Sequence, residues 1–220
     1  RLCGCFDSLK KSDEVLIQGK TKEYEHLETL IRQRRQDYLL PYVYNYRLVR
    51  LKGTFHRIED DMKYEFVEQI RTDYKKYMAC IKNNGYVDNW LRTVLESPKE
   101  YCDQLITEKE RIRETISRCQ GIVIYGAGKQ ADIIMRILYN EGFYDKINCF
   151  AVSELKQEQR IALKDVYTIE QAKKRYPESL FILAVVPGTN AYQEMERKLQ
   201  EIGVNEFLKT SDFFEKFNYI

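Results

Sequence analysis

The stretch IVIYGAGKQA, from Ile122 to Ala131, constrains the fold of this 220-residue chain more than any other. Four residues typical of a buried strand run directly into Gly126-Ala127-Gly128, and a helical pattern begins at Lys129. A strand that turns this tightly into a helix is the first half of a strand–helix–strand unit. The second half of the chain is therefore expected to build a parallel sheet.

The later segments alternate between strand and helix patterns. Leu180–Val186 is a continuous apolar run, as expected of a central strand in a parallel sheet. Because the types alternate, we predict an α/β fold with one mainly parallel, doubly wound, Rossmann-like sheet, in the strand order 3-2-1-4-5. The other expected strands are Ile147–Val152, Asp165–Tyr167 and Glu206–Leu208. The expected helices are Lys129–Tyr139, one opened by the capping box Thr168–Gln171, Asn190–Ile202 and Asp212–Phe217.

The first half of the chain is predicted to be entirely helical. Apolar residues recur every three or four positions in the segments expected to form helices. The stretch from Tyr42 to Leu51 alternates like a strand, but Pro41 at a first helical position favours a helix that ends near Gly53. The tyrosines between Tyr38 and Tyr46 are expected to pack between helices with their hydroxyls at the surface. The other expected helices are Lys22–Leu40, Arg57–Lys82 and one capped by Ser97 that runs from Pro98 to about Ser117. Residues 1–118 are thus expected to be a helical connecting region, and residues 119–220 a Rossmann-like nucleotide-binding domain.

Composition narrows the function classes. The chain has 36 Lys and Arg against 34 Asp and Glu, a net charge of +2, which gives no signal for nucleic-acid binding. Its six cysteines are scattered and it has two histidines, so no zinc-ligand spacing exists and reduced thiols of a cytoplasmic protein are expected. No apolar run is long enough to span a membrane. Because the chain begins at Arg1, it is expected to be part of a longer protein.

The glycine turn has the spacing of a phosphate-binding fingerprint. Gly126 would allow the tight turn, Gly128 the close approach of a pyrophosphate, and Ala131 the packing of the helix on the strand. The helix start at Lys129 and Gln130 would direct free N–H groups and a positive charge at an anion. The alternative, that glycine serves the turn alone, stays open at this point.

Two further segments are expected at the same edge of the sheet. Ser153-Glu154 follow the second strand, where an acid can hold a ribose, and Glu154 lies 26 residues beyond Gly128. The loop after the fourth strand would face them across the crevice. The candidate binding residues are Gly126, Ala127, Gly128, Lys129, Gln130, Ser153, Glu154, Pro187, Thr189 and Asn190.

Catalytic and metal-binding constellations are not expected. No histidine follows His56, so the second half can form no Ser–His or Cys–His pair. Tyr125 and Lys129 lie across the turn, not on one helix face as in short-chain reductases. Glu59-Asp60-Asp61 resembles an acidic metal motif, but it falls in the first turns of a predicted helix, where acids suit the dipole. The chain is therefore predicted to be a binding module without a catalyst of its own.

The segments IVIYGAGKQADIIMRIL, INCFAVSE, VYTIEQA and FILAVVP resemble the small Rossmann-like domains of bacterial surface-polysaccharide enzymes. Such domains occur at the end of family 2 glycosyltransferases, in sugar C-methyltransferases and at the front of sugar N-acyltransferases. The resemblance covers Gln120 to the C-terminus and departs at Lys129, because the small residue comes only at Ala131. The stretch YLLPYVYNYRLVRLKGTFHRIEDDMKYEF is similar to the helical segment that follows the catalytic domain in those glycosyltransferases.

This resemblance implies the accessory C-terminal part of a polysaccharide glycosyltransferase, with an upstream catalytic domain as partner and a place in the cytoplasm or at the inner face of the membrane. NAD(P) or a nucleotide-sugar would bind the glycine turn. A fragment of an NAD(P)-dependent oxidoreductase or epimerase, and an interaction domain without a ligand, are the alternatives. A basic, aromatic region could contact anionic lipid, pack on the catalytic domain, or form solvated helix faces. Its cations are Arg32, Arg34, Arg35, Arg47, Arg50 and Lys52.

Overall fold

The computed structural model describes residues 22–55, 58, 60–81, 94, 96–155, 160–214 and 216–217. They divide into two compact units, Arg1–Ile106 and Thr107–Ile220. The division falls within helix α5 (Pro98–Arg118), which begins at the predicted Pro98. The second unit starts earlier than residue 119 because Ile112 and Ile116 of α5 are buried in its core.

The described part of the first unit is helical, as expected. The helix predicted at Lys22–Leu40 is interrupted, however: residues 22–33 are helical, and Arg35 then has a left-handed φ of 56°. The prediction that Gly53 ends the next helix is also wrong, since α2 continues two residues further. The helix predicted from Arg57 begins only at Lys63, after a 3-10 turn. The elements are η1 (Asp37–Leu39), α2 (Leu40–Phe55), η2 (Asp60–Met62) and α3 (Lys63–Ile81).

A buried lysine fixes the end of α2 in the first unit. Lys63 is 2% exposed, and its ammonium donates hydrogen bonds of 2.9 Å to the carbonyls of Phe55 and Ile58. The same nitrogen lies 3.7 Å from a carboxylate oxygen of Asp60 and 4.8 Å from the centroid of the Phe55 ring. A cation at this position satisfies carbonyls that the helix end leaves free and complements the helix dipole.

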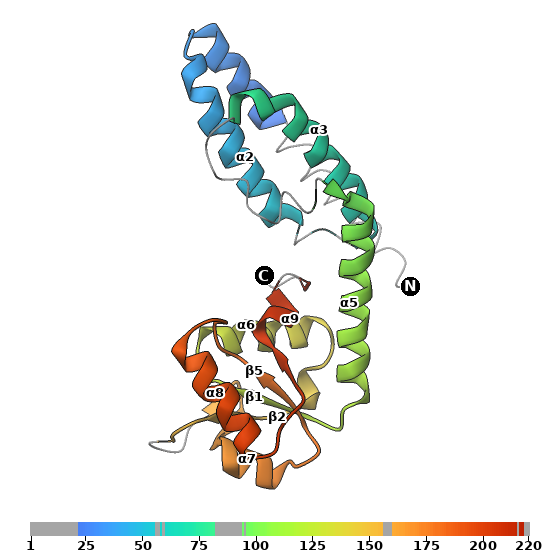
Figure 1. The fold of residues 1–220 in the computed structure, drawn as a ribbon, viewed down its shortest axis with the longest axis vertical. Helices are drawn as coiled ribbons and strands as arrows, with labels where there is room; N and C mark the ends of the chain where they lie inside the picture. The colour runs from blue at the N-terminus through green and yellow to red at the C-terminus, as the bar shows by residue number, and fades with distance from the viewer. Residues whose placement is uncertain are drawn as a thin grey trace. The chain divides into compact units, whose positions relative to one another are not determined.

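The second unit contains the expected sheet (Figure 1). Its strand order is β3-β4-β2-β1-β5-β6, and every pairing is parallel except that of β3 with β4. The five parallel strands follow the predicted 3-2-1-4-5 order, and the short β3 is added at one edge. The strands are β1 (Ile122–Tyr125), β2 (Ile147–Val152), β3 (Arg160–Ile161), β4 (Lys164–Thr168), β5 (Leu180–Leu183) and β6 (Phe207–Lys209).

Helices cover both faces of this sheet, so all four residues of β1 are buried (Figure 1). Ile122 and Ile124 face a core shared with α5, α6 and α9, whereas Val123 and Tyr125 face a core shared with α7 and α8. The alternation follows from the two-residue period of a strand. The helices are α6 (Lys129–Asn140), η3 (Tyr144–Lys146), α7 (Ile169–Arg175), α8 (Asn190–Glu201) and α9 (Thr210–Phe214).

Local sequence signals explain where two of these helices begin. The predicted capping box is present at α7, with the Thr168 hydroxyl accepting from the Gln171 N–H and the Gln171 side chain accepting from the Thr168 N–H. Thr189 caps α8 in the same way without the reciprocal bond. β5 ends at Leu183, three residues before the predicted end, because the chain leaves the sheet there for the loop that precedes α8.

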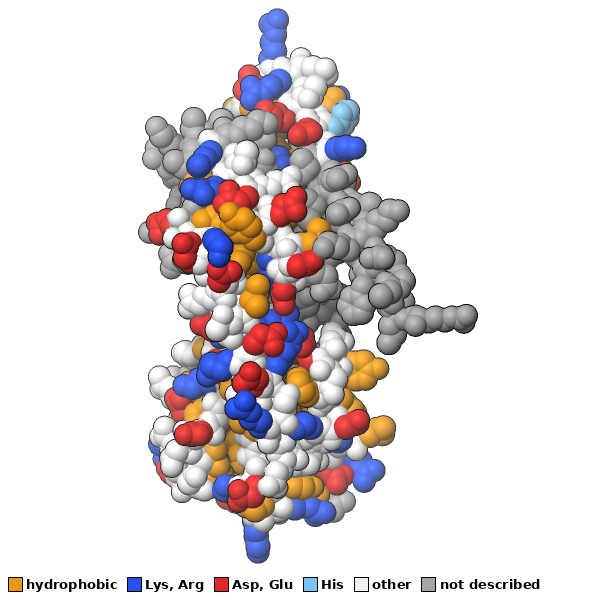
Figure 2. All heavy atoms as spheres, turned by 90° about the vertical axis from the view of Figure 1, so that its right-hand side faces the viewer, with side chains coloured by type: hydrophobic (Ala, Val, Ile, Leu, Met, Phe, Trp, Pro, Cys, Tyr) orange, Lys and Arg blue, Asp and Glu red, His pale blue; other side chains and the backbone are white. Residues whose placement is uncertain are grey.

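Basic and acidic side chains are intermixed on the face drawn in Figure 2, in keeping with the small net charge. Within the part of the chain that the structure describes, every helix is too short or too polar to cross a bilayer.

We expect Lys63→Met to destabilise the helical unit by about 2–4 kcal/mol, because two buried carbonyls lose a charged donor. Lys75→Met, at an exposed position of the same helix, should change stability by less than about 0.5 kcal/mol. Chemical denaturation followed by circular dichroism measures both. Equal stability of the two variants would contradict a capping role for Lys63.

Candidate functional site

The predicted binding segments meet at the carboxyl edge of the sheet. β1 lies between β2 and β5, and the chain crosses to the other side of β1 after β4. This reversal is the topological switch point, at which open α/β sheets bind their ligands. Residues 126–130 follow β1, Ser153-Glu154 follow β2, and residues 187–190 follow β5. All ten candidate residues therefore lie after three neighbouring parallel strands, in loops or at a helix start.

Gly126 is required by the packing of the sheet itself. Its N–H donates to the Ala151 carbonyl at 2.8 Å, and the Ala184 N–H donates to the Tyr125 carbonyl at 2.8 Å, so both ladders extend beyond β1. Its φ is +130°, and a Cβ on Gly126 would lie 2.6 Å from the Ala184 carbonyl oxygen. The close approach of β5 thus explains this glycine without a ligand.

Gly128 has no comparable structural requirement. Its φ of −102° and ψ of −162° are extended values that any residue adopts. A Cβ built on Gly128 meets no atom within 4 Å, so the space in front of this backbone is open. A glycine that neither conformation nor packing demands is consistent with the close approach of a ligand to the backbone.

The helix that begins at this turn lacks a side-chain cap. Gly128 is the N-cap of α6 and makes no side-chain hydrogen bond to the first turn, whereas α7 and α8 are capped by Thr168 and Thr189. The first N–H groups of an uncapped helix are available to an anion. Lys129 is exposed, and it takes part in none of the ion pairs formed among the described residues.

Gln130 carries an unsatisfied atom beside this turn. Its side-chain oxygen Oε1 is buried and finds no hydrogen-bond partner in the described part of the chain. A buried polar atom without a partner costs about 1–3 kcal/mol, and such atoms are rare in folded proteins. A donor from a bound molecule would remove that cost.

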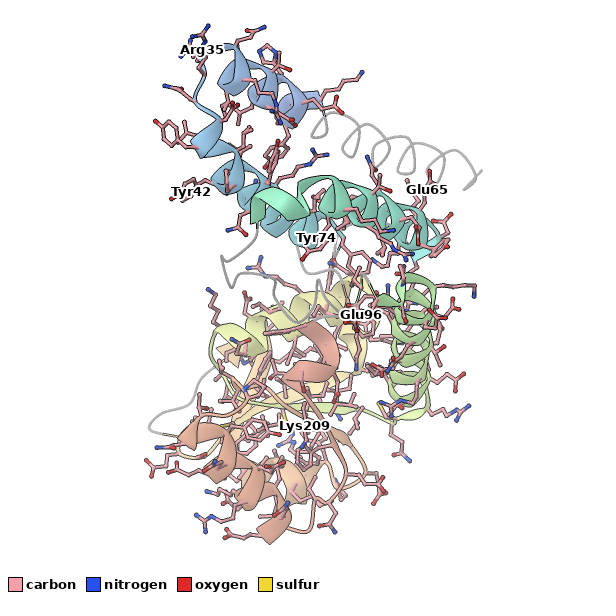
Figure 3. The ribbon with its side chains drawn as sticks, turned by 45° about the horizontal axis from the view of Figure 1, so that its top comes forward. Arg35, Tyr42, Glu65, Tyr74, Glu96 and Lys209 are labelled. Carbon is pink, nitrogen blue, oxygen red and sulfur yellow. The ribbon has the colours of Figure 1, made fainter. Side chains whose placement is uncertain are left out.

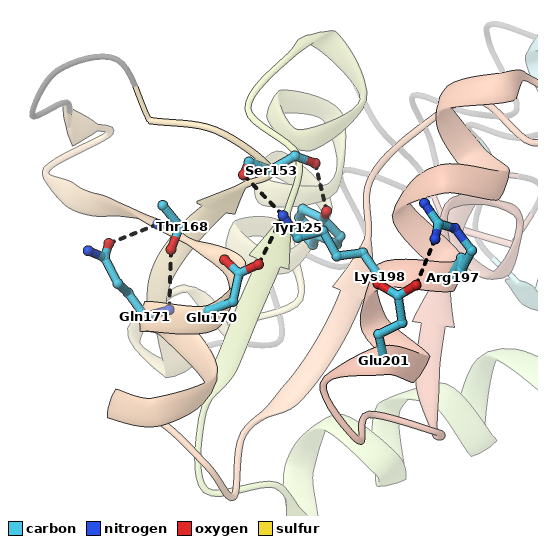
Figure 4. Close-up of polar contacts among 8 residues, drawn as sticks. All are labelled: Tyr125, Ser153, Thr168, Glu170, Gln171, Arg197, Lys198 and Glu201. Carbon is cyan, nitrogen blue, oxygen red and sulfur yellow. Dashed lines mark hydrogen bonds and ion pairs between the residues drawn. The ribbon is translucent and has the colours of Figure 1, made fainter.

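A polar network ties Ser153 to the sheet and to both helices of one face (Figure 4). Its hydroxyl shares a hydrogen bond of 2.7 Å with the hydroxyl of Tyr125, and its carbonyl accepts from Nζ of Lys198 at 3.3 Å. Lys198 also pairs with the Glu170 carboxylate at 2.9 Å. Burial raises the pKa of Tyr125, and the hydrogen bond from Lys198 lowers the pKa of Glu170. The network holds the end of β2 in place and leaves Glu154 exposed beside it.

The sequence did not identify Tyr125, Glu170 and Lys198 as part of this edge. Tyr125 ends an otherwise aliphatic strand. Its hydroxyl was the one feature of the sequence that indicated a polar contact at this edge. Glu170 and Lys198 belong to α7 and α8, two helices that are separate in the sequence. Only the three-dimensional arrangement brings their side chains to the end of β2.

In the loop after β5, Thr189 serves the fold. Its hydroxyl donates to the Val186 carbonyl at 2.8 Å and accepts from the Tyr192 N–H at 3.2 Å. The sequence assigned the Thr189 side chain to a ligand. Its hydroxyl instead donates one hydrogen bond that closes the loop and accepts one that caps α8. Pro187 and Asn190 are exposed on either side of it.

The most prominent hollow of the second unit lies beside the switch point, not at it. An open hollow of about 1030 Å³ follows the outer side of β4 and α7. Its Asp165 is held by Arg160 at 2.9 Å and by the Tyr167 hydroxyl at 3.2 Å, and Arg175 stacks 5.4 Å from the Tyr167 ring. Three of its four charged side chains, Arg160, Asp165 and Arg175, already contact one another or the Tyr167 ring, so the switch point remains the better candidate.

Metal or thiol chemistry would need acidic or thiol groups in a suitable arrangement. The described residues contain no cluster of three or more His, Cys, Asp or Glu that could hold a metal. Asp60 and Asp61 occupy η2 directly before α3, as expected of acids at a helix start, while Glu59 and His56 lie outside the described residues. The three described cysteine side chains are free, and burial raises the pKa of Cys102 to about 11 and that of Cys149 to about 12. Both thiols are therefore protonated and unreactive at neutral pH.

The two glycines of the turn should differ in their effect on folding. Gly126→Ala should cost at least about 2 kcal/mol, because it combines an unfavourable φ with a clash against the Ala184 carbonyl. Gly128→Ala should change stability by less than about 1 kcal/mol, since the position is open and extended. Thermal unfolding of the pair tests this. A Gly128 variant as unstable as the Gly126 variant would show that both glycines serve the turn.

Comparison with known proteins leaves the chain unassigned: no family model matches it, and no curated protein is significantly similar to it.

Proposed function

We propose that the unit Thr107–Ile220 binds the phosphate or pyrophosphate of a nucleotide or nucleotide-sugar at the turn Gly126–Gly128. The observation that carries the proposal is the contrast between the two glycines. Gly126 is explained by the approach of β5, whereas Gly128 has open space before it and an ordinary backbone conformation. The turn also lies at the switch point of the sheet, where this architecture binds phosphates.

The attraction for an anion comes from backbone and side chain together. The uncapped first turn of α6 presents free N–H groups, whose dipole contribution is about 0.3–1 kcal/mol. Lys129 adds a full positive charge at the start of the same helix. Asp132 also lies in the first turn of α6, but its carboxylate pairs with Arg136 at 3.0 Å. A bound phosphate would therefore be the counter-ion of Lys129 and of the free N–H groups.

Two neighbours of the turn suit the sugar of such a ligand. The unsatisfied Oε1 of Gln130 would accept a hydrogen bond from a ligand hydroxyl. The exposed carboxylate of Glu154 would accept from a ribose 2′-hydroxyl and would repel a 2′-phosphate. Ser153 is fixed by Tyr125 and Lys198, so the segment that carries Glu154 is held at the end of β2.

The wider role that we propose is that of an accessory C-terminal part of a bacterial glycosyltransferase for surface polysaccharide. The resemblance of the IYGAG segment supports it. We propose further that transfer needs an upstream catalytic domain. A cytoplasmic location belongs to the same proposal, since nucleotide-sugars are its ligands and the described cysteines are free thiols.

Gly128→Val tests the site directly. The variant places a branched side chain where the pyrophosphate would approach, so it should lower affinity at least about tenfold while the unit still folds. Calorimetric titration with UDP-sugars, CDP-sugars, NAD and NADP identifies the ligand class, and circular dichroism checks folding. Asn140→Val, at the other end of α6, is the matched control and should bind like the wild type.

The same titrations separate the alternatives. Preference for NAD would favour an oxidoreductase or epimerase, and preference for a nucleotide-sugar supports the proposal. Absence of binding by the wild type to every ligand, or unchanged affinity in a folded Gly128→Val variant, would overturn it.

Gln130→Met offers an independent test with two opposite effects. Removing an unsatisfied buried oxygen should leave stability unchanged or raise it by up to about 1 kcal/mol. Loss of the acceptor should weaken binding of the ligand found by titration by about threefold to tenfold. Denaturation and calorimetry measure the two quantities separately. A variant that is destabilised and binds normally would mean that Gln130 serves the fold.

A further inference from the structure

Three tyrosines project from one side of α2 and the 3-10 turn before it. Tyr38, Tyr42 and Tyr46 are 70%, 69% and 59% exposed, and Arg50 follows at the same four-residue spacing. We name Tyr38, Tyr42, Tyr46 and Arg50 the tyrosine stripe. Figure 3 shows Tyr42 pointing away from the helices. The sequence predicted that the four tyrosines of this segment pack between helices with their hydroxyls at the surface. Of the four, only Tyr44 is buried, and its hydroxyl is buried with it.

The stripe is distinct from the side of α2 that builds the core. Leu40, Tyr44 and Arg47 are buried, and Arg47 lies 5.5 Å from the ring of Tyr24. One face of α2 therefore packs into the core of the helical unit, and another face exposes aromatic side chains to solvent. Isolated exposed tyrosines are ordinary, but a row of three along α2 and the turn before it is the kind of surface that marks an interaction site.

Apolar surface continues beside the stripe. Leu27, from the helix at residues 22–33, is 40% exposed next to Tyr42 and Val43. Two open hollows of about 370 and 410 Å³ lie between this helix and α2, and both include Leu27, Tyr42 and Val43 in their walls. Both hollows are open to solvent along this face, so apolar groups of a bound surface could reach Leu27, Tyr42 and Val43.

The charges around the stripe are mostly positive. Within the stripe itself, the exposed Arg50 is the charged member, and the sequence from Tyr38 to Ile58 contains no acid. Arg34 and Arg35 are exposed just before the stripe. The acids that border it are Glu23 and Asp37. An anionic surface would therefore complement this face.

We propose that the tyrosine stripe lies in the headgroup region of an anionic lipid bilayer. A tyrosine has an apolar ring and a polar hydroxyl, so it suits a position between acyl chains and water. The flanking arginines would lie beside lipid phosphates, where each cation strengthens binding about fivefold. Contact of this kind needs no spanning helix, only one helix face that rests on the surface.

Co-sedimentation of the full chain with vesicles tests the proposal. Binding to phosphatidylglycerol-containing vesicles should exceed binding to pure phosphatidylcholine vesicles and should weaken with added salt. The double variant Tyr42→Ser, Tyr46→Ser should lose about tenfold in affinity. Its matched control replaces Tyr64 and Tyr139, which are 47% and 68% exposed on other helices, and should bind like the wild type.

A second variant keeps the test independent of the tyrosines. Arg50→Gln should weaken binding by about threefold to fivefold, whereas Arg118→Gln, an exposed arginine at the end of α5, should not. Absence of binding to anionic vesicles, or equal loss in stripe and control variants, would overturn the proposal. So would a dimer, detected by light scattering, that the stripe variants dissociate, because the face would then bind a second copy of this chain.

Discussion

The close approach of β1 and β5 at the centre of the sheet is the constraint on which the second unit depends. Tyr125 and Gly126 bond to both neighbouring strands, and the Ala184 carbonyl comes so near that only glycine fits. This contact closes the central ladder and turns the chain out of the sheet at the switch point. The start of α6, the end of β2 and the loop after β5 are placed at one edge as a result.

Because of this contact, Gly126 and Gly128 have different roles, although both are glycines of the same sequence pattern. A G-x-G-x-x-A fingerprint does not tell which glycine serves the fold. The geometry assigns Gly126 to sheet packing and leaves Gly128 without a structural reason. Thr189 shows the converse, because its hydroxyl looked like a ligand group and in fact caps a helix. The proposed site is therefore narrower than the ten predicted residues, and it centres on Gly128, Lys129 and Gln130.

Much of the fold could be predicted from local patterns. Buried strands such as Ile122–Tyr125 have continuous apolar sequences, and the capping box at Thr168 has a fixed spacing, so both are visible in the sequence. The break at Arg35 and the extension of α2 past Gly53 were missed, because packing within the helical unit outweighs single-residue propensities. The Tyr125–Ser153 and Lys198–Glu170 contacts were missed because they join residues 28 apart in each case. No local pattern encodes such pairs.

Binding of an anion at the start of α6 is measured most directly by backbone amide chemical shifts. Titration of the isotope-labelled chain with the nucleotide selected by calorimetry should move the amide signals of Gly128, Lys129 and Gln130 first, with smaller changes at Ser153 and Glu154. Shifts confined to the hollow beside β4, around Tyr167 and Arg175, would contradict the account, as would a spectrum that does not change at saturating nucleotide.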